Sequence, residues 1–359
     1  MSIGGYLAAE PGIFWVETAV MRLTDRLLKA LMYRTSSRVK AKHLYAFLRY
    51  NSPTKLWNLG RVTAGTALRR TSRFGYPYVI AVEPTNVCNV ECPACPTGRG
   101  EANGRKTRTM NLANFQKVID EIGRYVYVAN LQNWGEPLLA KDVAGMIAYC
   151  HDKRIYTSVE TNGNYPEALN ERLIDAHLDQ ITFAMDGSTQ EIYGAYRIGG
   201  RLELLLKNLR TLLRLRAERD VAHPFIEIQF LVFKHNRDDL SRIREMAQEL
   251  GVDGLLVRAG NAPNNQAIVK EFYTWPTGKR RFCDLPWRAA VVNSDGGVVP
   301  CCRHFQRKDD YGNMFEEAGG FEAIWNGPAF EKSRAAIAAT RLPDLHPVCS
   351  TCHVFRSSH

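Results

Sequence analysis

The sequence lacks any apolar run near the roughly 20 residues that a membrane-spanning helix needs, so we expect no such helix. It also has no positively charged stretch ahead of its first apolar segment and no small-residue cleavage site after it, which argues against a secretory signal peptide. Internal repeats and low-complexity tracts are absent as well. Together with 45% apolar and 23% charged residues among 359, these absences predict a cytoplasmic globular protein with a sizeable core.

Acidic residues are scarce in one part of the chain. Residues 21–75 hold thirteen Lys or Arg and one acid, Asp25, so this segment carries +12, while the rest carries 34 − 36 = −2. The segment "FWVETAVMRLTDRLLKALMY" has the apolar periodicity of an amphipathic helix. We therefore expect residues 1–75 to form a basic, helical N-terminal extension. Such an extension commonly packs on the protein body, but peripheral membrane contact or docking of an anionic partner would also use it.

Strand and helix patterns alternate from about residue 76 onward. The expected strands are 76–83, 125–132, 155–161, 180–186, 225–233 and 254–260, and the expected helices are 112–123, 139–152, 167–176, 201–218 and 237–250. This alternation predicts an α/β fold with a parallel sheet. Six units are fewer than the eight of a closed barrel, so we expect a partial (β/α)6, TIM-like barrel. Functional residues should then lie in the loops after the carboxyl ends of the strands.

The nine cysteines are clustered. Cys88, Cys92 and Cys95 lie in "EPTNVCNVECPACPTG" with the spacing C-x3-C-x2-C, five more lie beyond residue 282, and Cys150 stands alone. In a reducing compartment, clustered cysteines are more often metal or cluster ligands than disulfides. Three thiolates would leave one iron of a [4Fe–4S] cluster without a protein ligand, which is the open position of a catalytic centre. Zinc is the alternative on spacing alone.

Three further segments follow the next three expected strands in order. They are "NWGEPLL", "ETNGN" and "MDGSTQEIYGAYRIGG". With the cysteine loop, they resemble the radical S-adenosylmethionine (SAM) enzymes, and the last resembles the S-x-D-G…Y-R-x-G-G run of one branch of that family. The resemblance covers residues 76–359.

This resemblance implies a cofactor and its contacts. A [4Fe–4S] cluster held by Cys88, Cys92 and Cys95 would bind SAM through the open iron, and one electron would cleave SAM to a 5′-deoxyadenosyl radical that abstracts hydrogen from a C–H bond. The implied SAM-binding residues are Gly135, Glu136 and Pro137 near the amine, Asn162 near the ribose and Arg197 on the carboxylate. The family often has a large residue before the third cysteine, whereas this chain has Ala94, so adenine stacking from that position is open.

The C-terminal cysteines resemble the SPASM-type extension of the same enzymes, which binds auxiliary iron–sulfur clusters. The resemblance rests on "CDLPWRAAVVNSDGGVVPCC" and "CSTC", with a Gly-Asn pair and "IWN" between them. It implies one auxiliary [4Fe–4S] cluster, whose ligands would be Cys283, Cys301, Cys349 and Cys352. Cys302 would then be spare, or a hydrogen-atom donor.

Other residues near these cysteines leave alternatives open. On spacing alone, a zinc ribbon would suit Cys349-x2-Cys352 equally well. We expect His304 and His353 beside the cluster or in solvent, and Cys150 as a buried structural thiol.

The expected domains are the helical basic extension (1–75), a radical SAM core (76–262) and a small, loop-rich SPASM-type domain (263–359). The leading hypothesis is an oxidoreductase or epimerase acting on a small, sugar-like or envelope-related molecule, reduced by a partner such as flavodoxin or ferredoxin. A peptide-modifying maturase is second, because residues 1–75 show no strand-bearing leader-binding domain. A metal-stabilised nucleic-acid-binding protein is disfavoured, because aromatic residues do not interleave with the basic ones. A pure electron carrier would need no open coordination site.

No general base stands out in the sequence. Asp284 and Asp295 adjoin the C-terminal cysteines, but such carboxylates can equally be structural.

Overall fold

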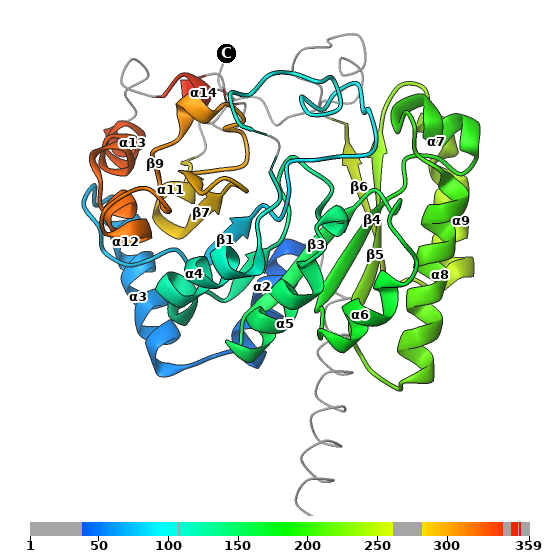
Figure 1. Cartoon of the computed structure of the whole chain (residues 1–359), viewed down its shortest axis with the longest axis horizontal. Helices are drawn as coiled ribbons and strands as arrows, with labels where there is room; N and C mark the ends of the chain where they lie inside the picture. Colours follow the sequence, from blue (N-terminus) through cyan, green and yellow to red (C-terminus); the bar gives the residue numbers. More distant parts are fainter. Residues whose placement is uncertain (1–37, 107, 261–281, 340–345, 351, 353–359) are drawn as a thin grey trace, which may run out of the picture.

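The computed structural model describes residues 38–106, 108–260, 282–339, 346–350 and 352 (Figure 1). The whole of the predicted N-terminal amphipathic segment, residues 14–33, lies outside these ranges, as does His353. Within the described part of the chain, no helix is both long and apolar enough to cross a bilayer.

Nine strands form one sheet in the order β6-β5-β4-β3-β2-β1-β7-β8-β9. Six of them match the predicted strands: β1 (Val79–Val82), β2 (Val128–Asn130), β3 (Tyr156–Thr161), β4 (Gln180–Ala184), β5 (Phe225–Val232) and β6 (Gly254–Ala259). These six are parallel and each pairs with the next, as expected when helices connect consecutive strands. Since β6 and β9 stand at opposite ends of the order, the sheet is open, which confirms the partial barrel.

Helices connect the parallel strands in the predicted places. They are α4 (Leu112–Ile122), α5 (Val143–Asp152), α6 (Leu169–Asp175), α8 (Leu202–Glu218) and α9 (Leu240–Leu250), with the 3-10 turns η1 (Gly123–Tyr125), η2 (Pro137–Leu139) and η3 (Arg237–Asp239). α4 shows the local causes: Asn111 caps its first turn by accepting from the Asn114 backbone N–H, and its apolar positions recur at helical spacing. A short helix that the sequence pattern did not predict, α7 (Gln190–Tyr196), follows β4.

The two faces of the sheet differ in chemistry. On β4, Ile181 and Phe183 join the main hydrophobic core, and on β5 Ile228 does the same. The alternate residues Thr182 and Glu227 are polar and buried, and they face each other in register. Because side chains alternate along a strand, the outer face packs on the helices and the concave face is polar.

The N-terminal helices are part of this body. α2 (Arg38–Arg49) packs Tyr45 against the first residues of β1 and β3, and the Tyr50 hydroxyl donates to Asp179 Oδ1 at 2.5 Å. α3 (Pro53–Ala67) is tied down by Asn58, whose side chain exchanges two hydrogen bonds with the Tyr76 backbone. α2 therefore covers the amino-terminal ends of the strands, opposite the loops that carry the cysteine motif.

The C-terminal part continues the same sheet. β7 (Ala289–Val292) pairs in parallel with β1, and β8 (Gly297–Val299) and β9 (Gly312–Asn313) follow in antiparallel. This part was expected to be loop-rich, yet it also contains α11 (Leu285–Arg288), α12 (Gly320–Trp325), α13 (Pro328–Ala339), α14 (Pro347–Ser350) and the turn η4 (Arg307–Asp309). Its indole donors reach back to the N-terminal segment, Trp325 to Gly75 O at 2.9 Å and Trp287 to Arg70 O at 2.7 Å.

Candidate functional site

The three-cysteine loop follows β1 at the carboxyl edge of the sheet. Cys92 is buried, Cys88 and Cys95 are half-buried, and all three pack in one group with Tyr196 and Phe233. Burial raises the pKa of the Cys88 thiol to about 11, and the neighbouring Glu136, Cys92 and Cys95 add to that rise. The three sulfur atoms therefore lie close enough to influence one another, as ligands of one cluster must.

The G-E-P segment packs directly beneath this loop. The Glu136 backbone N–H donates to Val87 O at 2.8 Å, and a Cβ atom added at Gly135 would lie 2.0 Å from Thr85 O. Glycine is therefore needed at 135 because the two backbones approach so closely. Pro137 begins η2, whose N-cap is Glu136.

Glu136 is a buried carboxylate with several donors from the chain. Oε1 accepts from the Leu138 backbone N–H at 3.1 Å and the Thr161 hydroxyl at 2.8 Å, and Oε2 accepts from the Asn162 backbone N–H at 2.7 Å. Burial raises its pKa, while these donors and Arg197 act in the opposite direction. In this structure, Glu136 joins the ends of β2 and β3. Its predicted contact with the SAM amine remains a prediction.

Asn162 links the end of β3 to the cysteine loop. Its side-chain Nδ2 donates to Asn89 Oδ1 at 2.8 Å and lies 3.8 Å from Cys88 Sγ. Asn89 in turn donates to Asn164 O at 2.6 Å. The structure thus brings the predicted residue to the cluster loop, and Asn89 is a partner that the motif comparison missed.

Arg197 reaches the same loop from the end of α7. Its Nε donates to Asp186 Oδ2 at 2.7 Å, and its Nη1 lies 3.5 Å from Cys92 Sγ. Asp186 is fully buried and also accepts from the Leu231 backbone N–H at 2.7 Å. The carboxylate fixes the guanidinium, and the guanidinium partly offsets the rise that burial causes in the pKa of Cys92. Asp186 was not predicted, although it stands in the quoted "MDG" directly after β4.

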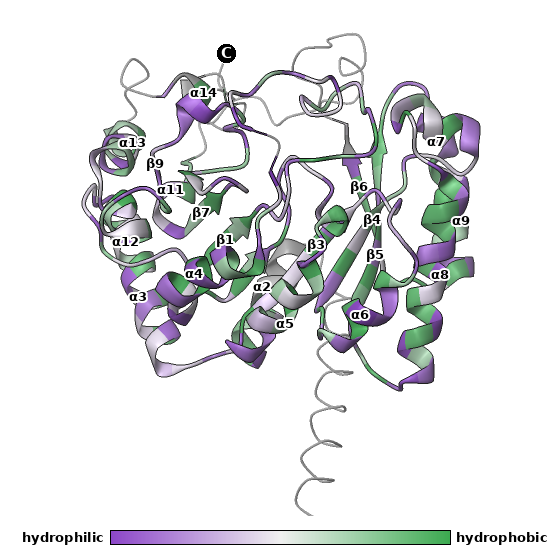
Figure 2. Cartoon of the chain, in the orientation of Figure 1, coloured by the Kyte–Doolittle hydropathy of each residue, from purple (hydrophilic) through white to green (hydrophobic). Residues whose placement is uncertain are grey.

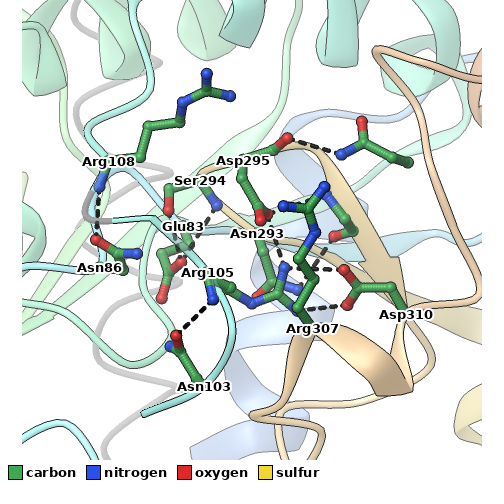
Figure 3. A network of polar contacts seen from close by, with 12 residues as sticks. Glu83, Asn86, Asn103, Arg105, Arg108, Asn293, Ser294, Asp295, Arg307 and Asp310 are labelled. Carbon is green, nitrogen blue, oxygen red and sulfur yellow. Dashed lines mark hydrogen bonds and ion pairs between the residues drawn. The ribbon is translucent and has the colours of Figure 1, made fainter. Parts of the chain in front are cut away.

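A polar network joins the cysteine loop to the C-terminal part (Figure 3). Glu83, the residue after β1, accepts from the Trp134 backbone N–H at 3.0 Å and from the Ser294 hydroxyl at 3.0 Å. Arg105 donates to Asp295 at 2.7 Å and forms a two-point ion pair with Asp310. Figure 3 shows Arg105 lying between these two carboxylates. Neither Glu83 nor Arg105 was predicted, because Ser294, Asp295 and Asp310 lie about two hundred positions away and Trp134 lies 51 positions away.

Four of the five C-terminal cysteines gather as a second group. Cys283, Cys349 and Cys352 pack against Trp287 and Ile337. Burial raises the pKa of Cys349 to about 12, with further contributions from Cys283 and Cys352.

Cys301 belongs to the same group. Burial, Cys302, Cys349 and Cys283 together raise the pKa of Cys301 well above its ordinary value. Cys302 is exposed. The choice of Cys301 as the fourth ligand remains a prediction of the motif alignment, because Cys302 also has a member of the group, Cys352, among the neighbours that, after burial, raise its pKa.

The donor sets fit iron–sulfur clusters. Among the described residues, no three His, Cys, Asp or Glu side chains converge closely enough to hold a single metal ion. A four-iron cube is larger than one ion and holds its thiolates further apart, so groups of three and four separated thiols match its ligand requirement.

The structure also shows where the other residues considered in the sequence lie. Cys150 is a fully buried thiol in the main core. His304 is buried as well, so it does not face solvent. Asp284 pairs with Arg288 at 2.7 Å, and Asp295 pairs with Arg105, so both carboxylates that were considered as bases have structural partners.

Comparison with known proteins identifies the two parts. The Radical SAM superfamily model matches residues 82–254, and the SPASM iron–sulfur cluster-binding domain model matches residues 283–353. The first match spans the strands and loops that hold Cys88 to Arg197, and the second spans the four gathered thiols.

Two curated proteins are similar to this chain over about half of its length. The chain is 28% identical to a probable GTP 3′,8-cyclase of Methanocaldococcus jannaschii over 48% of its length and 55% of that protein. It is 26% identical to a PqqA peptide cyclase of Ruegeria pomeroyi over 59% of its length and 52% of that protein. The chain thus spans about half the length of these relatives.

Streptococcus suis SuiB has been solved with S-adenosylmethionine (TM-score 0.60, 15% identity, 78% of this chain and 72% of SuiB) and with its precursor peptide SuiA (TM-score 0.59, 13% identity, 87% and 83%). At these identities, the likeness to SuiB shows the fold. This likeness in fold and the two family matches together identify the family of the chain. The chain is a radical SAM enzyme with a C-terminal SPASM domain, and its cofactors are S-adenosylmethionine and [4Fe–4S] clusters.

Proposed function

We propose that this radical SAM enzyme modifies a peptide, the alternative that the sequence ranked behind a small molecule. The observation that carries the proposal is the similarity to SuiB bound to its precursor peptide, which covers 87% of this chain and 83% of SuiB. The PqqA peptide cyclase match, over 59% of the chain, supports the same substrate class. The match to a GTP 3′,8-cyclase covers less of the chain, at 48%.

The roles of the residues follow from their positions. Cys88, Cys92 and Cys95 would hold the cluster that, with SAM bound, supplies a 5′-deoxyadenosyl radical for hydrogen abstraction. Asn162 and Arg197 border this loop and would orient SAM, Arg197 through a charge-assisted contact with its carboxylate. Glu136 would hold Asn162 in place and offer its remaining acceptor capacity to the SAM amine.

The substrate would enter the concave face of the sheet. Glu160 on β3, Thr182 on β4 and Glu227 on β5 stand in register and lie on the face opposite the helices. Such a polar surface suits the amide groups of a peptide backbone, which need hydrogen-bond partners when buried.

The auxiliary group suggests an oxidative outcome. A cluster with four thiolate ligands has no open site for substrate, so its chemistry when bound is electron transfer. A substrate that loses a hydrogen atom to the radical and then one electron and one proton has undergone a two-electron oxidation, as bond formation within a peptide requires. A one-electron donor such as flavodoxin or ferredoxin would reduce the first cluster.

One experiment tests the enzyme and the substrate class separately. The protein is purified without oxygen, reconstituted with iron and sulfide, and given SAM and dithionite, with Cys88→Ala beside it. We expect 5′-deoxyadenosine from the native chain and none from the variant. Absence of 5′-deoxyadenosine from the native chain would contradict the role of the loop, whatever the substrate.

The second arm uses extracts of cells grown in deuterated medium, divided by ultrafiltration into peptide and small-metabolite fractions. Deuterium that enters 5′-deoxyadenosine only with the peptide fraction, and that is lost after protease treatment, supports a peptide substrate. Protease-resistant transfer from the small-metabolite fraction would return the small-molecule hypothesis to first place.

A further inference from the structure

Exposed apolar side chains are concentrated on the two N-terminal helices. Ten large apolar residues are exposed in the described part of the chain, and five of them lie on or next to α2 and α3: Leu44, Leu48, Leu56, Trp57 and Leu68. We call these five residues, together with the exposed Arg61, Arg69 and Arg70, the α2–α3 surface. Trp57 is 72% exposed and Leu68 66%, so neither is covered by the described body. Single exposed apolar residues are ordinary, but a grouping of this kind marks an interaction surface.

The grouping follows from helix geometry. Leu44 and Leu48 are four residues apart and share one side of α2. On α3, Trp57, Arg61 and Leu68 recur at helical spacing along one stripe. A second stripe of α3, about a quarter turn away, is buried against the body through Lys55, Asn58, Val62 and Gly65. The exposed stripe is therefore held outward by a firmly packed helix.

All the charged side chains in residues 38–75 are basic. Residues 38–75 contain nine Lys or Arg and no Asp or Glu. Of these, Lys55 is buried and Arg73 pairs with Glu322 at 2.5 Å, so they are not available to a partner. Arg61, Arg69 and Arg70 are exposed. Their guanidinium groups stack on Phe74 or Phe282, which positions them but leaves their charge in place.

The body adds charge of the same sign beside α3. The turn η1 contacts α3, and its Arg124 is exposed. Figure 2 shows hydrophilic and hydrophobic residues alternating along α3. The surface thus combines leucines and a tryptophan with surrounding arginines.

We infer that the α2–α3 surface binds the interface of an anionic lipid membrane. Tryptophan and leucine on one side of a helix enter the boundary between headgroups and acyl chains, and arginines around them meet anionic headgroups. A nucleic acid would match the arginines but would leave four exposed leucines without a role. No described helix can span a bilayer, so the contact would be peripheral.

The position of the surface suits this role. α2 packs on the first residues of the strands, whereas the cysteine loop follows their last residues. In Figure 1, α2 and α3 (blue) lie at the end of the molecule away from α14. A chain bound to a membrane through α2 and α3 would keep its active site turned away from the lipid and open to substrate.

The test is sedimentation of the full, reconstituted chain with vesicles. One vesicle preparation is phosphatidylcholine alone, and the other contains a share of phosphatidylglycerol. We expect binding to the anionic vesicles that weakens as salt is added. The double variant Leu56→Ser/Trp57→Ser should bind at least about tenfold more weakly, because its apolar contact is lost. The double variant Arg61→Gln/Arg124→Gln should lose roughly fivefold per charge.

The control is Val257→Ser on β6, which removes an apolar residue that is 38% exposed but lies outside the surface. It should bind as the native chain does. The Leu56→Ser/Trp57→Ser variant should also keep native 5′-deoxyadenosine formation, which shows that it is folded. Absence of vesicle binding overturns the inference, as does binding that survives loss of Leu56 and Trp57. Retention of duplex DNA without vesicle binding would overturn it and assign the surface to nucleic acid.

Discussion

The two cysteine groups are built in different ways. Cys88, Cys92 and Cys95 lie within a single loop at the carboxyl edge of the sheet. The auxiliary thiols come from positions spread over residues 283–352, and three of them pack against Trp287 of α11 and Ile337 of α13. A short loop can present three ligands through local geometry, whereas the second group depends on the folding of the whole C-terminal part.

Their surroundings differ as well. The loop thiols pack on Tyr196 and Phe233 but also have polar neighbours: Asn162 beside Cys88, and Arg197 with its Asp186 beside Cys92. The auxiliary thiols pack against apolar side chains such as Trp287 and Ile337. A polar, charged environment suits a site that must bind a zwitterionic ligand, and an apolar one suits a cluster that only exchanges electrons.

Removal of one thiol from each group should have different consequences for the two groups. Cys92→Ala should abolish 5′-deoxyadenosine formation, because two thiols cannot hold the loop cluster. Cys349→Ala should lower it far less but abolish the modified product. Iron should fall from about eight to about four per chain in both variants. Iron analysis and chromatography of the nucleoside check this, and equal loss of 5′-deoxyadenosine in both would show that the groups are not independent.

A second prediction concerns the charge beside Cys92. Arg197→Gln leaves the buried Asp186 without its cation, which should lower the free energy of unfolding by roughly 3–5 kcal/mol. It should also weaken SAM binding about tenfold or more, as loss of a charged hydrogen bond does. Adding Asp186→Asn should restore part of the stability but not the SAM affinity. Urea unfolding and SAM titration check the two effects, and additive losses in stability would argue against the ion pair.

A third prediction concerns the close approach under the cysteine loop. Gly135→Ala places a methyl group against Thr85 O, so it should lower the free energy of unfolding by about 2 kcal/mol or more and loosen the loop cluster. Gly60→Ala is the matched control, because a Cβ atom there meets nothing within 4 Å on an exposed turn of α3. It should stabilise by about 0.5–1 kcal/mol. Equal behaviour of the two variants in urea unfolding and cluster absorbance would refute the steric argument.

The smallest effect concerns the network that connects the two groups. Burial raises the pKa of Asp310 from 3.8 to about 6, although Arg105 opposes that rise. The folded state therefore holds this proton more tightly than the unfolded state does. The protonated Asp310 carboxyl therefore adds to the free energy of unfolding below about pH 4, and this contribution is lost as the pH rises through 6.

Asp310→Asn should remove this part of the pH dependence, a change of roughly 2 kcal/mol between pH 4 and 7. Urea unfolding of the native chain and the variant across that range measures it. The same slope in both proteins would show that Asp310 does not titrate there.

Much of the site could be predicted because its motifs are local. The spacing of Cys88, Cys92 and Cys95 and the segment around Gly135 each lie within one loop, and the parallel alternation places those loops at one edge. The six strands and five helices between them were predictable for the same reason, since periodicity reports on neighbours within one element. The missed helix α7 lies within the run "MDGSTQEIYGAYRIGG", which was interpreted as a binding segment and not as a helix.

The partners of these residues could not be predicted. Nothing near Arg105 in the chain indicates Asp295 or Asp310, and nothing near Glu83 indicates Ser294. Likewise, the run "AAVV" does not show that it will pair with β1 rather than with another strand. These contacts join positions separated by up to about two hundred residues, so no local pattern records them.

The sequence by itself determined which ligand types the protein carries, their spacing in the first loop, and the alternation that places that loop at an active edge. Those properties depend on residues that are neighbours in the chain. Only the tertiary structure decided that Cys283, Cys301, Cys349 and Cys352 meet, that Asp186 holds Arg197 on Cys92, and that α2 and α3 turn their apolar residues outward. Those properties depend on which surfaces pack together, a result of burial across the whole fold that no single segment specifies.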